Sequence, residues 1–496
     1  MHLPFKKFIQ VTLSILGFGF FGTSYASTAG QFLALADLHF NPFSYCVTDQ
    51  PCPMIKELQL ANPSGSASSK NSWLSIFNQA ASQPISALGS DTNEALLNLT
   101  LNYIETLPID YDCITINGDF IAHHFSSQFA QFSGLDTNSP NYQEKYQSFV
   151  RKTFQYIQYR LHLALPSKSI YITLGNNDSY DDDYVYSPDQ NHADNFYHEM
   201  SAIWSPLIFD DQNQRNFESA FGNAGYYAIT VPENQPDSPN RILFLNTNLY
   251  SAENNQGAGT RVPLAAEQQL AWLKTQLKQI RKNHGHAILI YHIPNGADNY
   301  ASASANSAVM LWGEKNDHAY NDEFSDIVQQ YHNVITSMMT AHYHMDGFQL
   351  MHEKHNARSE VLDTFVNGIS PKNQSNPGFK LYRYDPSTLN LTDFKTYYLN
   401  IAEDEVNNVW REEYDFNRVY QPTCEFSNNC NLLTGYEKIN SDSNSERTHR
   451  YIALYSASSG NQPINEGAWM PFYWCATQYQ LESAYRACLI SQGRIN

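Results

Sequence analysis

Aspartate, asparagine and histidine recur in five short segments that are widely separated in the chain. In chain order these segments are "DLH" (37–39), "GDF" (118–120), "GNND" (175–178), "YH" (291–292) and "HYH" (342–344). Imidazole and carboxylate ligands together suit zinc, iron or manganese, and the lack of thiolates in these segments argues against a structural zinc site. Two such metal ions about 3.5–4 Å apart, sharing a carboxylate, form the arrangement that hydrolyses phosphate esters.

Each segment begins no more than three positions after the end of a short apolar run of the length of a buried strand. The runs are "QFLALA", "CITI", "SIYITL", "HAILI" and "VITSMM". Apolar residues at three- and four-residue spacings predict helices between some of them, in "SQFAQF", "EKYQSFVRKTFQYIQYRLHLAL" and "AAEQQLAWLKTQLKQIRK". Alternating strands and helices indicate an α/β sheet, in which ligands gather outside the carboxyl ends of the strands. One histidine after a strand is more often structural, but five such segments predict a common site.

In "DLH" and "HYH" two candidate ligands are separated by one residue. Because side chains alternate along an extended strand, this spacing predicts that both ligands of a pair lie on the same side of a strand. Two such pairs and one shared carboxylate are enough for two metal ions. The segment "GNND" also has a second interpretation, since glycine, asparagine and aspartate favour plain turns.

The five segments, in this order, resemble the signature of the calcineurin-like metallophosphoesterases. The stretches "GDFIAH", "YHIPNG" and "LFLNTNLY" are similar to one branch of that family, the acid sphingomyelinase-like phosphodiesterases. The resemblance extends from about Leu35 to Asn400. It implies an α/β fold in which a β-sandwich is flanked by helices (αββα).

The resemblance also implies two bound divalent metal ions, with Zn²⁺ expected and iron or manganese as alternatives. It assigns three ligands to the first ion, three to the second, and a bridging carboxylate to both. The ligands of the first ion are Asp37, His39 and His344, and those of the second are Asn176, His292 and His342. Asp119 is the carboxylate that bridges the two ions. Asn176 is expected to bind through its amide oxygen, and a plain turn at "GNND" is the alternative.

Two further residues are candidates for the catalytic step. His123 matches the second catalytic histidine of the branch and is the candidate general acid for the leaving group, whereas a surface-loop role for His123 or His124 is the alternative. Asn177 stands where the family usually has a histidine that helps with the developing charge, and "GNND" is also similar to endopolyphosphatases of the branch. Ala341 replaces the usual glycine of the last motif.

The first 26 residues have the pattern of a signal peptide. Lys6 and Lys7 precede an apolar run, and "SYA" supplies the small residues of a cleavage site after Ala26. With an uncleaved anchor as the alternative, we expect a secreted or periplasmic protein that has no stable membrane anchor after cleavage. The formal net charge of −19 disfavours binding to nucleic-acid duplexes, because an acidic surface repels the phosphate backbone.

The sequence suggests three parts: a signal peptide (1–26), a catalytic domain (27–400) and a helical, disulfide-containing C-terminal subdomain (401–496). Within the last part, "EDEVNNVWREEYDFNRVY" and "QYQLESAYRACLISQ" have the amphipathic spacing of helices. Residues 62–93, rich in serine and asparagine, are expected to form an ordered insertion beside the site.

Six of the seven cysteines form three couples that are close in sequence, although spacing alone does not establish the connectivity. The couples are Cys46 and Cys52, Cys424 and Cys430, and Cys475 and Cys488, which leaves Cys113 in an apolar run. Disulfides are typical of an oxidising compartment and therefore agree with the signal peptide.

These features predict a secreted two-metal phosphohydrolase that cleaves phosphodiester or phosphoanhydride bonds through a metal-bridging hydroxide. Soluble, nucleotide-like phosphate esters are the expected substrates, because the first motif follows the signal peptide too closely for a saposin-like lipid-extracting module. Endopolyphosphatase and sphingomyelin phosphodiesterase are alternative activities. A secreted binding protein that has kept the fold and lost the chemistry is an alternative of a different class.

Overall fold

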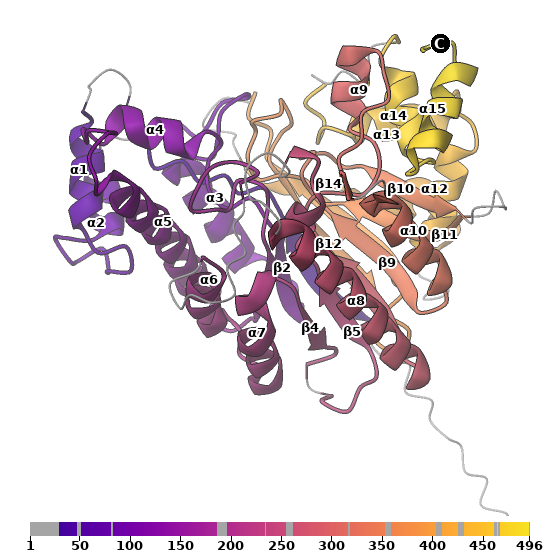
Figure 1. The fold of residues 1–496 in the computed structure, drawn as a ribbon, viewed down its shortest axis with the longest axis horizontal. Helices are drawn as coiled ribbons and strands as arrows, with labels where there is room; N and C mark the ends of the chain where they lie inside the picture. Colours follow the sequence, from indigo (N-terminus) through magenta and orange to yellow (C-terminus); the bar gives the residue numbers. More distant parts are fainter. Residues whose placement is uncertain are drawn as a thin grey trace, which may run out of the picture.

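Two six-stranded sheets form the centre of the computed structural model (Figure 1). The first has the order β14-β13-β12-β1-β2-β3 and the second the order β10-β11-β9-β6-β5-β4. The model describes residues 29–46, 51–80, 83–185, 196–233, 235–253, 261–315, 318–352, 359–402, 409–424, 431–460, 464 and 467–495. The predicted signal peptide lies outside these residues.

The first sheet is made of β1 (Gly30–Leu35), β2 (Cys113–Asn117), β3 (Ile170–Thr173), β12 (Gly378–Tyr384), β13 (Leu391–Tyr398) and β14 (Arg411–Asp415). The second is made of β4 (Tyr227–Thr230), β5 (Arg241–Phe244), β6 (Ala287–Ile290), β9 (Ile335–Thr340), β10 (Phe348–His352) and β11 (Ser359–Phe365). A separate two-stranded sheet pairs β7 (Glu314–Lys315) with β8 (His318–Ala319). All five predicted strands are present.

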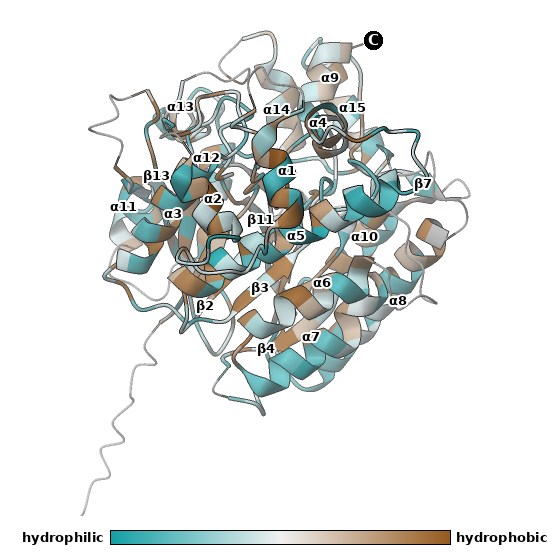
Figure 2. Cartoon of the chain, turned by 90° about the vertical axis from the view of Figure 1, so that its left-hand side faces the viewer, coloured by the Kyte–Doolittle hydropathy of each residue, from teal (hydrophilic) through white to brown (hydrophobic). Residues whose placement is uncertain are grey.

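Helices cover both sides of the sheets. They are α1 (Pro53–Leu60), α2 (Trp73–Gln79), α3 (Glu94–Thr106), α4 (Phe125–Phe132), α5 (Tyr142–Ala164), α6 (Phe196–Trp204), α7 (Asp211–Ala224), α8 (Arg261–Lys282), α9 (Asn299–Ala305), α10 (Tyr320–Gln330), α11 (Phe416–Tyr420), α12 (Leu432–Asn440), α13 (Glu446–Leu454), α14 (Met470–Ala476) and α15 (Glu482–Ser491). The predicted sandwich flanked by helices is confirmed. Figure 2 shows apolar strands, such as β2, β3 and β4, behind helices with hydrophilic outward faces.

Residues from both sheets share one hydrophobic core, which holds the two sheets together. Leu33 and Ile116 of the first sheet and Ile290 and Met339 of the second are all at most 1% exposed and belong to the same cluster. Because each sheet is covered on both faces, its parallel strands consist of nearly continuous apolar residues. This explains why the strands were recognisable in the sequence as short apolar runs.

The helix predicted within 403–420 is only partly present. Residues 403–408 lie outside the described part, Arg411–Asp415 form β14, and a helix begins only at Phe416. β14 pairs antiparallel with β13. The free backbone groups of β13 offer a partner that amphipathic spacing does not reveal, so pairing overrides the local helical pattern.

The C-terminal helices α12–α15 contain a disulfide between Cys475 and Cys488, as predicted. The Cys46–Cys52 disulfide is also confirmed, and Cys113 is a buried free thiol. Cys424 is disulfide-bonded, but its predicted partner Cys430 lies outside the described residues. Within the described part of the chain, no helix is long and apolar enough to cross a membrane.

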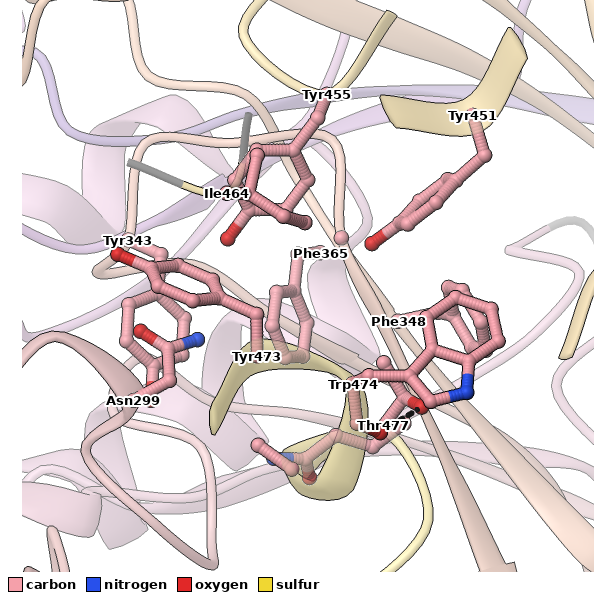
Figure 3. A pocket seen from close by; sticks show the side chains of 13 residues that line it. Asn299, Tyr343, Phe348, Phe365, Tyr451, Tyr455, Ile464, Tyr473, Trp474 and Thr477 are labelled. Carbon is pink, nitrogen blue, oxygen red and sulfur yellow. Dashed lines mark hydrogen bonds between the residues drawn. The ribbon is translucent and has the colours of Figure 1, made fainter. Parts of the chain in front are cut away.

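An aromatic pocket lies between the C-terminal helices and the second sheet (Figure 3). Tyr451, Tyr473 and Trp474 line it from the C-terminal helices, opposite Phe348 and Phe365 of the second sheet. Its free volume of about 10 Å³ holds roughly one water molecule. The pocket is therefore a closely packed contact between the C-terminal helices and the second sheet, with no room for a lipid chain.

A buried ion pair strengthens the same region. Lys380 Nζ donates to Asp346 Oδ1 at 2.7 Å, and Asp346 Oδ2 accepts from Thr396 Oγ1 at 3.1 Å and from Tyr414 OH at 2.7 Å. Lys380 is 0% exposed. Removing one member of such a pair leaves the other charge buried without compensation.

Lys380→Met is therefore expected to lower the free energy of unfolding by about 3–5 kcal/mol, measured by urea denaturation. The matched control is Lys274→Met, which removes a surface pair with Glu323 and should cost no more than about 1 kcal/mol. Equal losses in the two variants would contradict the structural role of the buried pair.

Candidate metal centre

The ends of five strands bring all seven predicted ligands together. β1, β2 and β3 are parallel neighbours in the first sheet, and β6 and β9 are parallel neighbours in the second. Their carboxyl ends therefore lie at one edge of each sheet. Candidate ligand atoms form three groups, and within each group the atoms lie within 4.8 Å of one another. The groups are His39, His123 and His344; Asp119, His292 and His342; and Asp37, His39 and Asp119.

Asp119 occupies the centre of this cluster. Its Oδ2 lies 3.3 Å from His39 Nε2 and 3.2 Å from His292 Nε2. His39 Nε2 in turn faces His344 Nε2 at 3.2 Å. One carboxylate thus contacts imidazoles from both predicted ligand sets, which is the position that a bridging ligand requires.

The amide of Asn176 joins the second set. Asn176 Oδ1 lies 2.9 Å from His342 Nδ1 and 3.1 Å from His292 Nε2. The alternative of a plain turn does not account for this side-chain position, because a turn requires only the backbone. The oxygen therefore lies where a ligand shared with two imidazoles would be.

The predicted position of the "DLH" and "HYH" ligands on extended strands is wrong. β1 and β9 both end before the first ligand of each pair. Asp37, His39, His342 and His344 instead have φ values of 48°, 41°, 71° and 64°. Holding a non-glycine residue in this left-handed backbone conformation raises its conformational free energy by on the order of 1–3 kcal/mol. A tight turn after each strand, and not the strand itself, directs both ligands into the site.

Backbone carbonyls determine which ring nitrogen each histidine presents. A carbonyl only accepts, so an Nδ1 beside one carries a proton, and in the neutral ring Nε2 is then the unprotonated nitrogen. The three Nδ1-to-carbonyl distances are 3.1 Å from His39 to Ile121, 2.7 Å from His292 to Asn117 and 3.0 Å from His344 to Ser370. In the neutral form of each ring, Nε2 is therefore available as a ligand. Although burial opposes the charged form, the negative charge of Asp119 raises the pKa of His292 to about 9, and a bound divalent cation would reverse this shift.

The electrostatics of the cluster favour neutral imidazoles at three positions. Burial, followed by the charges of neighbouring histidines, lowers the pKa of His342 to about 3 and that of His344 to about 4. The same causes hold the pKa of His39 well below its usual range. Neutral imidazole is the form that binds metal.

Asp37 tests whether these residues fit a metal ion. Its side chain is fully buried, and within the described part of the chain neither carboxylate oxygen has a hydrogen-bond partner. Burial raises the pKa of Asp37 to about 8, which a nearby divalent cation would reverse. A buried carboxylate without a partner is costly, and the unprotonated nitrogens around it are metal ligands. The donor set therefore fits divalent cations.

Gly175 leaves the space that the Asp119 carboxylate occupies. A Cβ added at Gly175 would lie 2.1 Å from Asp119 Oδ1 and 2.3 Å from the Asp119 backbone nitrogen. The backbone part of this contact leaves little room for relaxation. The glycine that begins "GNND" is thus required by close packing against the ligand.

Gly175→Ala is expected to displace Asp119 and reduce bound zinc to less than half of the wild-type content after dialysis. Phosphodiester hydrolysis should fall at least ~100-fold, because a shift of about 1 Å in a catalytic constellation has an effect of that size. Gly467→Ala is the matched control, since among the described residues no atom beyond its chain neighbours lies within 4 Å of the added Cβ. Wild-type metal content in Gly175→Ala would contradict the assignment.

His123 lies beside the cluster and not on a free surface loop. Its Nδ1 is 2.8 Å from Asp91 Oδ1, and its ring stacks on His39 with centroids 3.9 Å apart. Although burial opposes the charged form, the hydrogen bond with Asp91 raises the pKa of His123. His124, by contrast, is exposed. These contacts match the predicted general acid, whose role stays a prediction.

Asp91 had no recognisable signal of its own in the sequence. It belongs to the serine- and asparagine-rich insertion, which does contact the site as expected. Asp91 Oδ2 also accepts from the His123 backbone N–H at 3.1 Å, so both carboxylate oxygens hold the same residue. Only the fold brings these residues together, because they are 32 positions apart.

Asn177 is directed toward the Asp119 carboxylate. Its backbone N–H donates to Asp119 Oδ1 at 2.8 Å, and its side-chain Nδ2 donates to Asp119 Oδ2 at 3.0 Å. Next to it, Asp178 accepts from the backbone N–H groups of Asp119, Phe120 and Gly175 at 2.8–2.9 Å. The contact of Asn177 with a substrate phosphate stays a prediction.

Comparison with known protein families agrees with this geometry. The family model of the calcineurin-like phosphoesterases matches residues 30–346, which include all seven candidate ligands. The chain belongs to this family. The model of the acid sphingomyelin phosphodiesterase C-terminal region matches residues 360–495 of this phosphoesterase. The resemblance recognised in the sequence is confirmed.

Curated relatives of the phosphoesterase have related names. Acid sphingomyelinase-like phosphodiesterase 3b of Mus musculus is 25% identical, over 94% of this chain and 91% of that protein. Cyclic GMP-AMP phosphodiesterase SMPDL3A of Homo sapiens is 28% identical, over 51% of this chain and 52% of that protein. Sphingomyelinase phosphodiesterase D of Dictyostelium discoideum is 27% identical, over 67% of this chain and 66% of that protein.

A cleft of about 850 Å³ gives access to the metal-ligand cluster of the phosphoesterase. Asp119, His123, Asn176, His342 and His344 line its inner part. Its other described lining residues include five tyrosines and one cationic side chain, namely Tyr184, Tyr300, Tyr343, Tyr455, Tyr473 and Lys372. Tyr455 and Tyr473 belong to the C-terminal region, which therefore forms part of the cleft wall.

Proposed function

We propose that this phosphoesterase is a two-metal phosphodiesterase that acts on small phosphate esters. The observation that carries the proposal is the convergence of six other candidate ligands around Asp119. Among the described residues, the buried oxygens of Asp37 have no hydrogen-bond partner. Asp37, His39 and His344 would hold one divalent ion, and Asn176, His292 and His342 the other. Zn²⁺ is the expected metal, since imidazole and carboxylate ligands suit it, with iron or manganese as alternatives.

Bound divalent ions would supply an activated water and positive charge beside the phosphate. The chain's own residues then have separate tasks. His123 donates a proton to the departing oxygen, and Asp91 holds its ring in place. Asn177 fixes both oxygens of Asp119. In this account Asn177 acts first on the bridging ligand, and any contact with the phosphate is secondary.

Nucleotide-like phosphodiesters are the proposed substrates. Tyrosine rings offer stacking surfaces for a base, and Lys372 offers a cation for a second phosphate. A long polyphosphate would need several cations, but Lys372 is the only lysine or arginine among the described lining residues. The name of the human relative, a cyclic GMP-AMP phosphodiesterase, agrees with a nucleotide substrate.

Sphingomyelin is the second candidate substrate. Relatives from Dictyostelium discoideum are named sphingomyelinase phosphodiesterases, and the cleft is wide enough for a phosphodiester head group. The aromatic pocket beside the cleft has no space for an acyl chain. A lipid would therefore have to leave its chains in the membrane or at the mouth of the cleft.

The test is hydrolysis of bis(p-nitrophenyl) phosphate, p-nitrophenyl phosphate, ATP, a cyclic dinucleotide and sphingomyelin vesicles by the zinc-loaded mature protein. We expect the diester and the nucleotides to be hydrolysed faster than the monoester or the vesicles. Preference for the vesicles would establish the second candidate. A metal-loaded protein that hydrolyses none of them would favour the binding-protein alternative.

Export with cleavage after Ala26 is part of the proposal. The two described disulfides support it, because structural disulfides persist in oxidising compartments. N-terminal sequencing of the exported protein is expected to begin at Ser27. A mature protein that retains residues 1–26 would instead support the uncleaved anchor.

A further inference from the structure

Three consecutive aspartates, Asp181, Asp182 and Asp183, follow the "GNND" segment. Only one of them has a described hydrogen bond to a candidate ligand: Asp183 Oδ1 accepts from Asn176 Nδ2 at 2.7 Å. The next residue strengthens the contact, because the Tyr184 backbone N–H donates to the Asn176 carbonyl at 2.9 Å. The loop therefore folds back and holds Asn176 at both its side chain and its backbone.

This contact determines which end of the Asn176 amide faces the cluster. The two ends of an amide have nearly the same shape, so packing alone distinguishes them poorly. An ionised carboxylate accepts hydrogen bonds and does not donate them, so Asp183 selects the NH₂ end. The oxygen must then point the other way, toward His342 at 2.9 Å and His292 at 3.1 Å.

We propose that Asp183 is a positioning residue for the second metal ion: it holds the Asn176 amide with its oxygen toward the cation. This inference rests on the proposed function, because it needs a cation between Asn176, His292 and His342. A rotated amide would present two N–H donors to the cation and lose one ligand. The carboxylate also polarises the amide, so the oxygen becomes a better ligand.

The chain provides a matched control in the adjacent residue. Asp182 carries the same charge in the same loop, but its Oδ1 accepts from Ser126 Oγ at 2.9 Å and from the Asp183 backbone N–H at 3.0 Å. Asp182 is exposed. Replacing Asp182 removes one negative charge near the cleft and none of the atoms that contact Asn176. The comparison therefore separates positioning from general electrostatics.

The experiment is calorimetric titration of Zn²⁺ into the metal-free mature protein and into its Asp183→Ala, Asp183→Asn and Asp182→Ala variants. Asp183→Ala is expected to weaken binding of the second equivalent by about 10–100-fold, the usual effect of losing an outer partner of a ligand, and to leave the first nearly unchanged. Asp183→Asn keeps an acceptor oxygen, so its affinity for the second equivalent of Zn²⁺ should fall less than that of Asp183→Ala. The affinity of Asp182→Ala for each equivalent of Zn²⁺ should stay within about twofold of the wild-type value.

Two outcomes of the titration would contradict the positioning role of Asp183, and a third would also contradict the proposed function. Wild-type binding of both equivalents by Asp183→Ala and Asp183→Asn, or an equal loss in Asp182→Ala, would overturn the positioning role while the proposed function stands. Because Asp183→Asn preserves the size of the side chain, it serves as the decisive variant if Asp183→Ala does not fold. A wild-type protein that binds fewer than two equivalents would overturn both this inference and the proposed function.

Discussion

Asp119→Asn is expected to abolish both metal retention and turnover. The carboxylate lies 3.2–3.3 Å from His39 and His292, which belong to different ligand sets. An asparagine keeps the shape but removes the negative charge that two divalent ions would share. Hydrolysis of bis(p-nitrophenyl) phosphate should fall at least ~1000-fold, since the loss affects both ions and therefore acts on the whole catalytic unit.

The loss must be specific to this position to support the account. Asp110→Asn is the control, because Asp110 is 98% exposed and pairs only with Lys168 among the described residues. That variant should keep its metal and its rate. Metal content measured after dialysis, together with melting temperature, separates loss of the site from loss of the fold. An Asp119→Asn protein with two bound ions and full activity would contradict the bridging role.

His123→Ala is expected to reduce hydrolysis strongly only where the leaving group is poor. A general acid contributes about 10²–10⁴-fold when the departing oxygen needs a proton. Nitrophenolate leaves readily without one, so its release should slow by less than about tenfold. The measurement is kcat/KM on bis(p-nitrophenyl) phosphate and on a dialkyl-type or nucleoside diester, with wild type and variant in parallel.

The neighbouring histidine supplies the control for this experiment. His124 is exposed and precedes α4, whereas His123 stacks on His39 and is held by Asp91. His124→Ala should therefore behave as wild type on both substrates. Equal losses of His123→Ala on good and poor leaving groups would show that the residue supports the site without donating the proton.

The strands and most of the candidate site could be predicted because the fold is locally consistent. Strands buried on both faces are short apolar runs, and the residues that follow them lie at one edge of each sheet. Asp119, Asn176 and His292 could therefore be placed from their positions after such runs. The order of the motifs then distinguished the site from isolated structural histidines.

Other features depend on contacts that local sequence does not encode. The left-handed turns at Asp37 and His342 have no glycine to mark them, so the ligands were wrongly assigned to extended strands. Asp91 and Asp183 act through hydrogen bonds that only the folded loops create. β14 depends on the free edge of β13, which local helical spacing does not reveal.

The number of metal ions required for activity tests the central claim most directly. Metal-free mature protein would be titrated with Zn²⁺ while hydrolysis of bis(p-nitrophenyl) phosphate is followed. We expect the rate to rise to its maximum at two equivalents per chain, because Asp119 joins two ligand sets. A full rate at one equivalent, or activity that survives complete metal removal, would contradict it.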